Sequence, residues 1–234
     1  MTTLQHNYAT VCQQVRQAAQ DAGRAAECVQ LIAVSKTFPV ADIRQVYAAG
    51  ARHFGENYVQ EWYEKTTALA DLPDIVWHMI GDVQSNKTKY VAERAAWVHT
   101  ISRLKIAQRL NDQRPSHLPP LQVCIEVNIA GEANKHGVAP TEAVALACEV
   151  AKLPKLQVRG LMCVAQTNGS EAELRQQFHT MQQLLQQLNQ AGVAADVLSM
   201  GMSADMTLAI ACGATHVRVG SAIFGKRDYP IQAE

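Results

Sequence analysis

The feature that most constrains the fold is an alternation of short apolar runs with longer helical patterns along the chain. Strand, helix and strand in repeated order produce parallel strands joined by right-handed crossovers. Because eight such strands occur within about 200 residues, the pattern predicts a (β/α)₈ barrel. The predicted strands are 31–36, 53–56, 75–80, 97–101, 121–129, 156–164, 197–200 and 216–224.

Helical patterns lie between these runs, at 40–49, 58–69, 84–95, 103–111, 141–152, 171–191 and 203–211. An extra amphipathic helix precedes the first strand, with Leu4, Tyr8 and Val11 on one face and an end near Gly23. We therefore expect an α/β protein made of one barrel domain over residues 1–234. The alternative is an open doubly wound sheet. Such a sheet usually carries a glycine fingerprint after its first strand, and VSKTFPV contains no glycine.

Composition narrows the classes of partner. Lys plus Arg and Asp plus Glu are equal at 21 each, so bulk charge does not favour a nucleic acid or a membrane surface. The N-terminus lacks a secretory signal, and no apolar stretch reaches the roughly 18 residues of a membrane span. The six cysteines include no CxxC pair, which indicates free thiols in a reducing compartment. We expect a soluble, cytoplasmic monomer without a bound metal.

The first predicted strand, LIAVSK, ends on a primary amine at Lys36. An amine at the edge of a core is desolvated, and desolvation disfavours its charged form. The free amine is the nucleophile that forms an imine with an aldehyde. The alternative is an ordinary lysine whose stem lies along apolar surface and whose ammonium reaches water.

Polar residues follow most of the other predicted strands, and in a barrel these strand ends form the active face. Two of the ends are glycine-serine turns, LSMGMSADM and HVRVGSAIFG, and we expect Ser203 to cap the helix after the first turn. Loops after the seventh and eighth strands commonly bind phosphate through backbone N–H groups. Each turn could alternatively be a simple helix cap.

An amine after the first strand and a phosphate cradle after the last two define a phosphorylated aldehyde as ligand. Pyridoxal 5'-phosphate (PLP) fits both ends. Arg218 lies in the last strand and could face the ring nitrogen of PLP. A guanidinium only donates hydrogen bonds, so its partner would be an unprotonated pyridine nitrogen and the ring a weaker electron sink. The alternative for Arg218 is a surface salt bridge.

A family resemblance covers nearly the whole chain. The segments LIAVSKTFP, RHFGENYVQE, WHMIGDVQSNK, HTISRLKIAQRLNDQRP, VNIAGEANKHG, RGLMCV, LSMGMSADM and VRVGSAIFG together resemble the PLP homeostasis protein family of the YggS/PROSC type. That family resembles the N-terminal barrel of alanine racemase. The resemblance implies a single barrel that carries PLP covalently bound to Lys36 as an internal aldimine.

The same resemblance assigns the site residue by residue. It implies that Asn57 and His78 lie around the cofactor and that Arg218 faces the pyridine nitrogen. Around the phosphate it implies Ser199, Gly201, Met202, Ser203, Gly220 and Ser221. The chain departs from the family pattern at Asp82 and Val83, where a proline-leucine pair is common, so the shape of the third loop is open.

Racemases of this type use a second domain and a dimer to bring an acid-base tyrosine to the cofactor. Only residues 225–234 follow the eighth predicted strand, so we expect no second domain here. An open cofactor face would leave a reactive carbanion poorly protected. We therefore expect a PLP-binding protein of intracellular vitamin B6 homeostasis, with no catalytic residues and no turnover of its own, whose transient partners are PLP-dependent apo-enzymes. The alternatives are a small PLP-dependent amino-acid racemase or lyase, and a Schiff-base aldolase without PLP.

Overall fold

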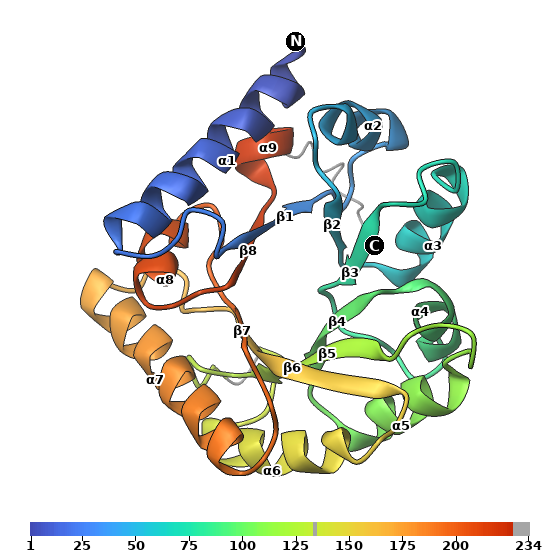
Figure 1. The fold of residues 1–234 in the computed structure, drawn as a ribbon, viewed down its shortest axis with the longest axis vertical. Coiled ribbons are helices and arrows are strands. Elements are labelled where there is room, and N and C mark those ends of the chain that lie inside the picture. The colour runs from blue at the N-terminus through green and yellow to red at the C-terminus, as the bar shows by residue number, and fades with distance from the viewer. Residues whose placement is uncertain (133–134, 227–234) are drawn as a thin grey trace, which may run out of the picture.

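The eight apolar runs form eight parallel strands, which pair in chain order and close into a barrel where β8 meets β1 (Figure 1). The computed structural model describes residues 1–132 and 135–226. The strands are β1 Gln30–Val34, β2 His53–Glu56, β3 Val76–Met79, β4 Trp97–Ile101, β5 Leu121–Val127, β6 Leu156–Cys163, β7 Val197–Ser199 and β8 His216–Val219. The predicted barrel is confirmed.

The helices surround the strands (Figure 1). They are α1 Thr3–Asp21, α2 Val40–Ala48, α3 Val59–Ala68, α4 Thr88–Arg94, α5 Leu104–Gln113, α6 Pro140–Ala151, α7 Glu171–Gln190, α8 Met206–Ala211 and α9 Ser221–Phe224. The extra helix α1 lies beside α8 and α9, outside the seam between β8 and β1 (Figure 1). Asn7 Nδ2 donates to the carbonyl of Ile223 across this contact, at 3.0 Å. Gly23 follows α1 with φ 70°, which confirms the predicted helix end.

Three predicted boundaries differ from the structure by three residues or more, and the first strand ends at Val34, two residues before Lys36. The run 216–224 is not one strand, because β8 ends at Val219 and Ser221–Phe224 form α9. An apolar run does not distinguish a buried strand from a buried helical turn. Ile223 and Phe224 are buried residues of α9. Helix α4 begins at Thr88 rather than at residue 84, and α8 begins at Met206 rather than at Ser203. The residue before α8 is Asp205, whose Oδ1 accepts from the Met202 N–H at 2.6 Å, so Ser203 is not the cap.

The strand residues divide between two apolar clusters. Val98, Val123, Leu161 and Leu198 belong to the main core, which includes helical residues such as Ile106 and Leu184. Their chain neighbours Trp97, Cys124, Met162 and Val197 form a separate cluster. Since successive side chains of a strand point to opposite faces, the second cluster fills the barrel interior.

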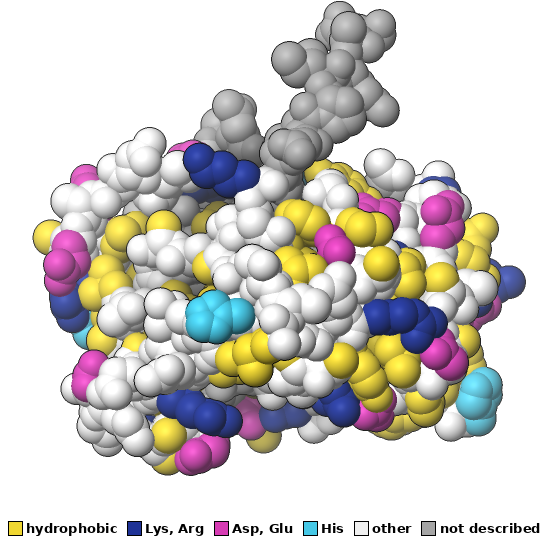
Figure 2. All heavy atoms as spheres, turned by 90° about the horizontal axis from the view of Figure 1, so that it is seen from above, with side chains coloured by type: hydrophobic (Ala, Val, Ile, Leu, Met, Phe, Trp, Pro, Cys, Tyr) yellow, Lys and Arg dark blue, Asp and Glu magenta, His cyan; other side chains and the backbone are white. Residues whose placement is uncertain are grey.

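The surface carries both signs of charge. On the face shown in Figure 2, the basic and acidic side chains of the described residues are interspersed rather than gathered by sign. All six cysteines are free thiols, as expected, and Cys124, Cys163 and Cys212 are buried. Within residues 1–132 and 135–226, no helix is long and apolar enough to cross a membrane.

Strand β6 contains a β-bulge opposite β5. Val123 and Cys124 of β5 pair with Val158 and Gly160, which leaves Arg159 as an extra residue in β6. A Cβ atom at position 160 would lie 1.9 Å from the carbonyl oxygen of Val197. The close approach of β6 to β7 therefore requires glycine.

We predict that Gly160→Ala lowers the free energy of unfolding by about 3 kcal/mol, because the new methyl group overpacks against the β7 backbone. Urea denaturation measures the loss. The control is Gly169→Ala, whose Cβ would meet its nearest neighbour at 3.4 Å and should change stability by less than about 0.5 kcal/mol. Equal stabilities of the two variants would contradict the argument.

Candidate functional site

A cavity of about 720 Å³ opens at the carboxyl ends of the strands, where barrel active sites lie. The loops after β1, β2, β7 and β8 meet there. Seven of the ten predicted cofactor residues line it, namely Lys36, Asn57, Met202, Ser203, Arg218, Gly220 and Ser221. The structure thus brings together residues that are distant in the chain, such as Lys36 and Ser221, which lie 185 positions apart.

The other three predicted residues, His78, Ser199 and Gly201, are buried and do not line the cavity. Gly201 supports it from behind. It has φ 99°, and its carbonyl accepts from the Arg218 N–H at 3.0 Å. A Cβ there would lie 2.7 Å from Ala209 Cβ, so glycine is needed for the turn to pack on α8.

Lys36 stands in a short segment that is held on both sides by one buried ion-pair network. On one side, Lys65 Nζ of α3 donates to the carbonyl of Ser35 at 2.7 Å. On the other, the Thr37 N–H donates to Glu61 Oε1 at 2.6 Å. Lys65 also pairs with Glu61 at 2.6 Å and with Glu56 at 2.7 Å. The position of the Lys36 backbone therefore depends on a lysine 29 residues later in the chain.

Glu56 is the fully buried member of this network. Its Oε1 accepts from Ser35 Oγ at 2.6 Å as well as from Lys65. Burial raises the pKa of Glu56, and the charge of Lys65 and the two hydrogen bonds oppose that shift. The sequence pattern does not predict a role for Lys65, because the contact of α3 with the loop after β1 is a tertiary contact.

Aromatic stacking joins the first loop to the last turn. The rings of Phe38 and Phe224 stack with centroids 5.0 Å apart. In the glycine-serine turns, Ser221 Oγ donates to Ser203 Oγ at 3.3 Å. The two predicted phosphate turns therefore meet, and α9 is fixed beside the segment that carries Lys36.

Arg218 is a buried cation, only 5% exposed, that reaches the cavity from inside the barrel. It donates from one terminal nitrogen to Ser199 Oγ at 2.7 Å and from the other to the carbonyl of Cys163 at 2.8 Å. Burial lowers the pKa of Arg218, yet a guanidinium keeps its charge in proteins. Among the described residues no carboxylate forms an ion pair with it, which rules out the predicted alternative of a surface salt bridge.

A column of hydrogen-bonded histidines connects Arg218 to the opposite end of the barrel. The column runs from Ser199 Oγ to His99 Nδ1, from His99 Nε2 to His78 Nδ1, and from His78 Nε2 to His53 Nδ1, each at 2.9 Å. His78 also stacks on Trp97, with centroids 5.6 Å apart, which places the column among the interior side chains. His78 thus reaches the cavity only through its neighbours.

The imidazoles of the histidine column are neutral near pH 7. Burial holds the pKa of His78 and of His99 well below the ordinary value, and nearby histidines add to the effect. The cation of Arg218 favours the arrangement in which each N–H points away from it, so we assign Ser199 as donor to His99, His99 to His78 and His78 to His53.

In residues 1–132 and 135–226, no group of three His, Cys, Asp or Glu side chains is arranged to hold a metal ion.

Glu126, near the end of β5, is a site residue that sequence analysis missed. It is 8% exposed and lines a second cavity of about 670 Å³, next to the first. Burial raises the pKa of Glu126 to about 7, while His136 and Arg218 oppose the shift. Its place within an apolar strand, IEV, was the available signal.

The third loop, whose shape was open, forms one wall of this second cavity. Val83 is buried, and Asp82 lies 3.4 Å from Arg103. Thr100 Oγ1 donates to the Gly81 carbonyl at 2.7 Å, which ties the loop to β4.

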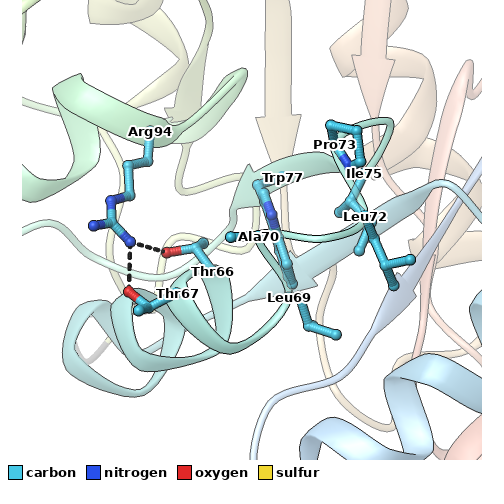
Figure 3. Close-up of a pocket in the computed structure, with 9 residues that line it drawn as sticks. All are labelled: Thr66, Thr67, Leu69, Ala70, Leu72, Pro73, Ile75, Trp77 and Arg94. Atoms are coloured by element: carbon cyan, nitrogen blue, oxygen red, sulfur yellow. Dashed lines mark hydrogen bonds between the residues drawn. The ribbon is translucent and has the colours of Figure 1, made fainter.

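Another cavity, of about 420 Å³, lies outside the barrel between the ends of α3 and α4 (Figure 3). Arg94 lies at one side of it and donates to Thr66 Oγ1 and Thr67 Oγ1 at 2.8 and 2.7 Å (Figure 3). Leu69, Leu72 and Trp77 supply most of its apolar wall. None of the predicted site residues lines it, so we place the functional site at the carboxyl ends of the strands.

We predict that Lys65→Met destabilises the fold by about 3–5 kcal/mol, because it leaves the buried Glu56 carboxylate without its cation. Chemical denaturation measures the loss. Lys152→Met is the matched control, since Lys152 pairs with Glu149 on the exposed face of α6 and should cost less than about 1 kcal/mol. Similar losses in both variants would contradict the role assigned to Lys65.

A second prediction follows from the raised pKa of Glu126. Above its unfolded pKa the unfolded chain gives up this proton first, so the stability that the protonated form provides is lost as the pH rises toward about 7. Raising the pH from 5 to 8 should therefore lower the free energy of unfolding of the parent by about 2–3 kcal/mol more than that of Glu126→Gln. Urea denaturation at both pH values measures the difference. The exposed Glu27→Gln is the control, and a difference from the parent equal to that of this control would contradict the assignment.

Comparison with known proteins agrees with this geometry. Residues 3–228 match the family described as alanine racemase, N-terminal domain. The chain is 52% identical over 233 residues to the pyridoxal phosphate homeostasis protein of Pseudomonas aeruginosa, and the match covers 100% of both chains.

Two solved structures are also similar. A protein described as unknown, from Bifidobacterium adolescentis, is 30% identical with a TM-score of 0.90, and the match covers 95% of this chain and 94% of that one. The structure of PipY from Synechococcus elongatus with PLP bound is 37% identical with a TM-score of 0.79, and the match covers 90% of this chain and 100% of PipY. The chain therefore belongs to the pyridoxal phosphate homeostasis proteins, within the alanine racemase N-terminal domain family.

Proposed function

We propose that this protein binds PLP in the cavity at the carboxyl ends of its strands and serves intracellular PLP homeostasis. The observation that carries the proposal is that Lys36 and the buried Arg218 line the same cavity. A buried cation without a carboxylate partner is costly unless a ligand or dipoles compensate it. The relative from Pseudomonas aeruginosa and PipY with PLP bound support the same ligand.

The residues present fit PLP. A cavity of about 720 Å³ lies within the usual range for small-molecule sites. The Ser203 and Ser221 hydroxyls and the backbone of the Gly220 turn supply donors for a phosphate group at one end. Arg218 supplies donors at the other, for a pyridine nitrogen. Asn57, another of the predicted cofactor residues, lines the same cavity.

In this proposal Lys36 holds PLP covalently. The Lys36 amine would hold PLP at its aldehyde carbon, because a free amine is the nucleophile that reacts with an aldehyde. Bound PLP supplies an electron sink, and Arg218 weakens that sink because it can only donate to the ring nitrogen. The histidine column and Ser199 hold Arg218 in place. His78, Ser199 and Gly201 thus support the cofactor residues rather than touching the ligand.

We propose a carrier rather than an enzyme. The names of the curated relatives refer to homeostasis and not to a reaction, which supports this choice over a racemase or a lyase. On this view the protein is a monomer that holds PLP and releases it to PLP-dependent apo-enzymes. Turnover of L-alanine or another amino acid well above the rate with free PLP, followed by chirality, would contradict the carrier assignment.

The test of PLP binding is the visible absorbance of the purified protein with added PLP. We expect an imine band, its loss on borohydride reduction, and a pyridoxyl group on the peptide that contains Lys36. Lys36→Ala should lose the band. Lys152→Ala should keep it, because Lys152 is exposed at the end of α6. A protein that stays colourless with PLP, or a label on another lysine alone, would overturn the proposal.

A further inference from the structure

The mouth of the barrel holds two adjoining cavities. The first is the proposed PLP cavity, and the second, of about 670 Å³, lies over the carboxyl ends of β3, β4 and β5. The two share the side chains of Asn57, Ile80 and Val164. A ligand in the second cavity would therefore lie beside the first without occupying the Lys36 position.

Two buried oxygen atoms at the second cavity have no hydrogen-bond partner among the described residues. They are Glu126 Oε2 and Asn57 Oδ1. Asn57 Oδ1 is an acceptor, as is Glu126 Oε2 when the carboxyl group is ionised, and Glu126 is more than nine-tenths buried. Leaving a buried acceptor unsatisfied is costly, and more so for a carboxylate than for an amide.

Three nearby protein donors form hydrogen bonds elsewhere, while His136 and Lys87 lie in the wall of the same cavity. Arg218 donates to Ser199 and to Cys163. Lys135 Nζ pairs with Glu132 at 2.8 Å and donates to the carbonyl of Ala165 at 3.2 Å. Thr100 donates to the Gly81 carbonyl. These contacts leave the Glu126 carboxylate facing a cavity without a donor from any of the three.

We propose that the second cavity binds the primary ammonium group of a small amine, with Glu126 as its counter-ion and Asn57 as a further acceptor. A primary ammonium group carries three donors and a positive charge, which matches a carboxylate and an amide oxygen. A neutral alcohol offers one donor and no charge, so it satisfies the pair poorly. The inference goes beyond the proposed function and does not depend on PLP binding.

The ammonium group could come from a simple alkylamine or from an amino acid, and two charged residues of the cavity wall act in opposite directions on the carboxylate of an amino acid. Asp82 adds a second carboxylate to the wall, which disfavours the carboxylate of an amino acid. Lys87 adds a cation, which favours it. Propylamine and L-alanine are therefore the two probes, and 1-propanol is the uncharged control.

The experiment is a calorimetric titration of each probe into the full-length protein, both without PLP and after PLP loading and borohydride reduction. Reduction removes the imine, so an amine can bind only non-covalently. We expect propylamine to bind in both preparations and 1-propanol not to bind. Glu126→Gln should weaken propylamine binding at least tenfold, which corresponds to about 1.4 kcal/mol. The exposed Glu149→Gln should leave it unchanged.

L-Alanine binding that is also weakened by Glu126→Gln would extend the site to amino acids, and its absence would restrict the site to amines without a carboxylate. Absence of propylamine binding, or equal affinity in the parent and Glu126→Gln, would overturn the proposal. Since the unloaded protein is titrated too, a failure to bind PLP would contradict the proposed function alone.

Discussion

The geometry of the candidate site depends on the ion pairs of Lys65. This side chain is nearly inaccessible to solvent, and it contacts the backbone before Lys36 and the carboxylates of Glu56 and Glu61. Each partner comes from a different part of the first two β/α units. In a low-dielectric interior such a network is strong only when all its members are present. It therefore fixes β1, β2 and α3 relative to one another next to Lys36.

The parts of the fold that could be predicted from the sequence are those set by local patterns. Each strand has an apolar run of its own, and the end of α1 at Gly23 follows from the conformational freedom of glycine. The error at 221–224 arose because buried helical turns and buried strands share the same apolar composition. The start of α8 was misplaced because the residue before the helix is Asp205, whose side chain accepts from the Met202 N–H, and not Ser203.

The candidate site could be predicted only as far as strand ends reveal it. Lys36, Asn57 and Arg218 line one cavity because the carboxyl ends of parallel strands meet on one face. The histidine column joins residues of different strands, and the Lys65 network joins helix α3 to Ser35 and to β2, so both depend on tertiary contacts that a local sequence pattern does not show. Glu126 was missed because its strand contains few other polar residues, although a carboxylate in an apolar strand is itself unusual.

The histidine column has a consequence for how this family can vary. His78 and His99 each donate and accept one hydrogen bond inside the barrel, so replacing either ring leaves two neighbours unsatisfied, and His53 accepts from His78 at the end of the column. Substitutions at positions 53, 78 and 99 should therefore be correlated among related sequences, with whole sets exchanged for apolar side chains of similar volume. An engineer who redesigns the barrel interior faces the same restriction and must treat these positions as one unit.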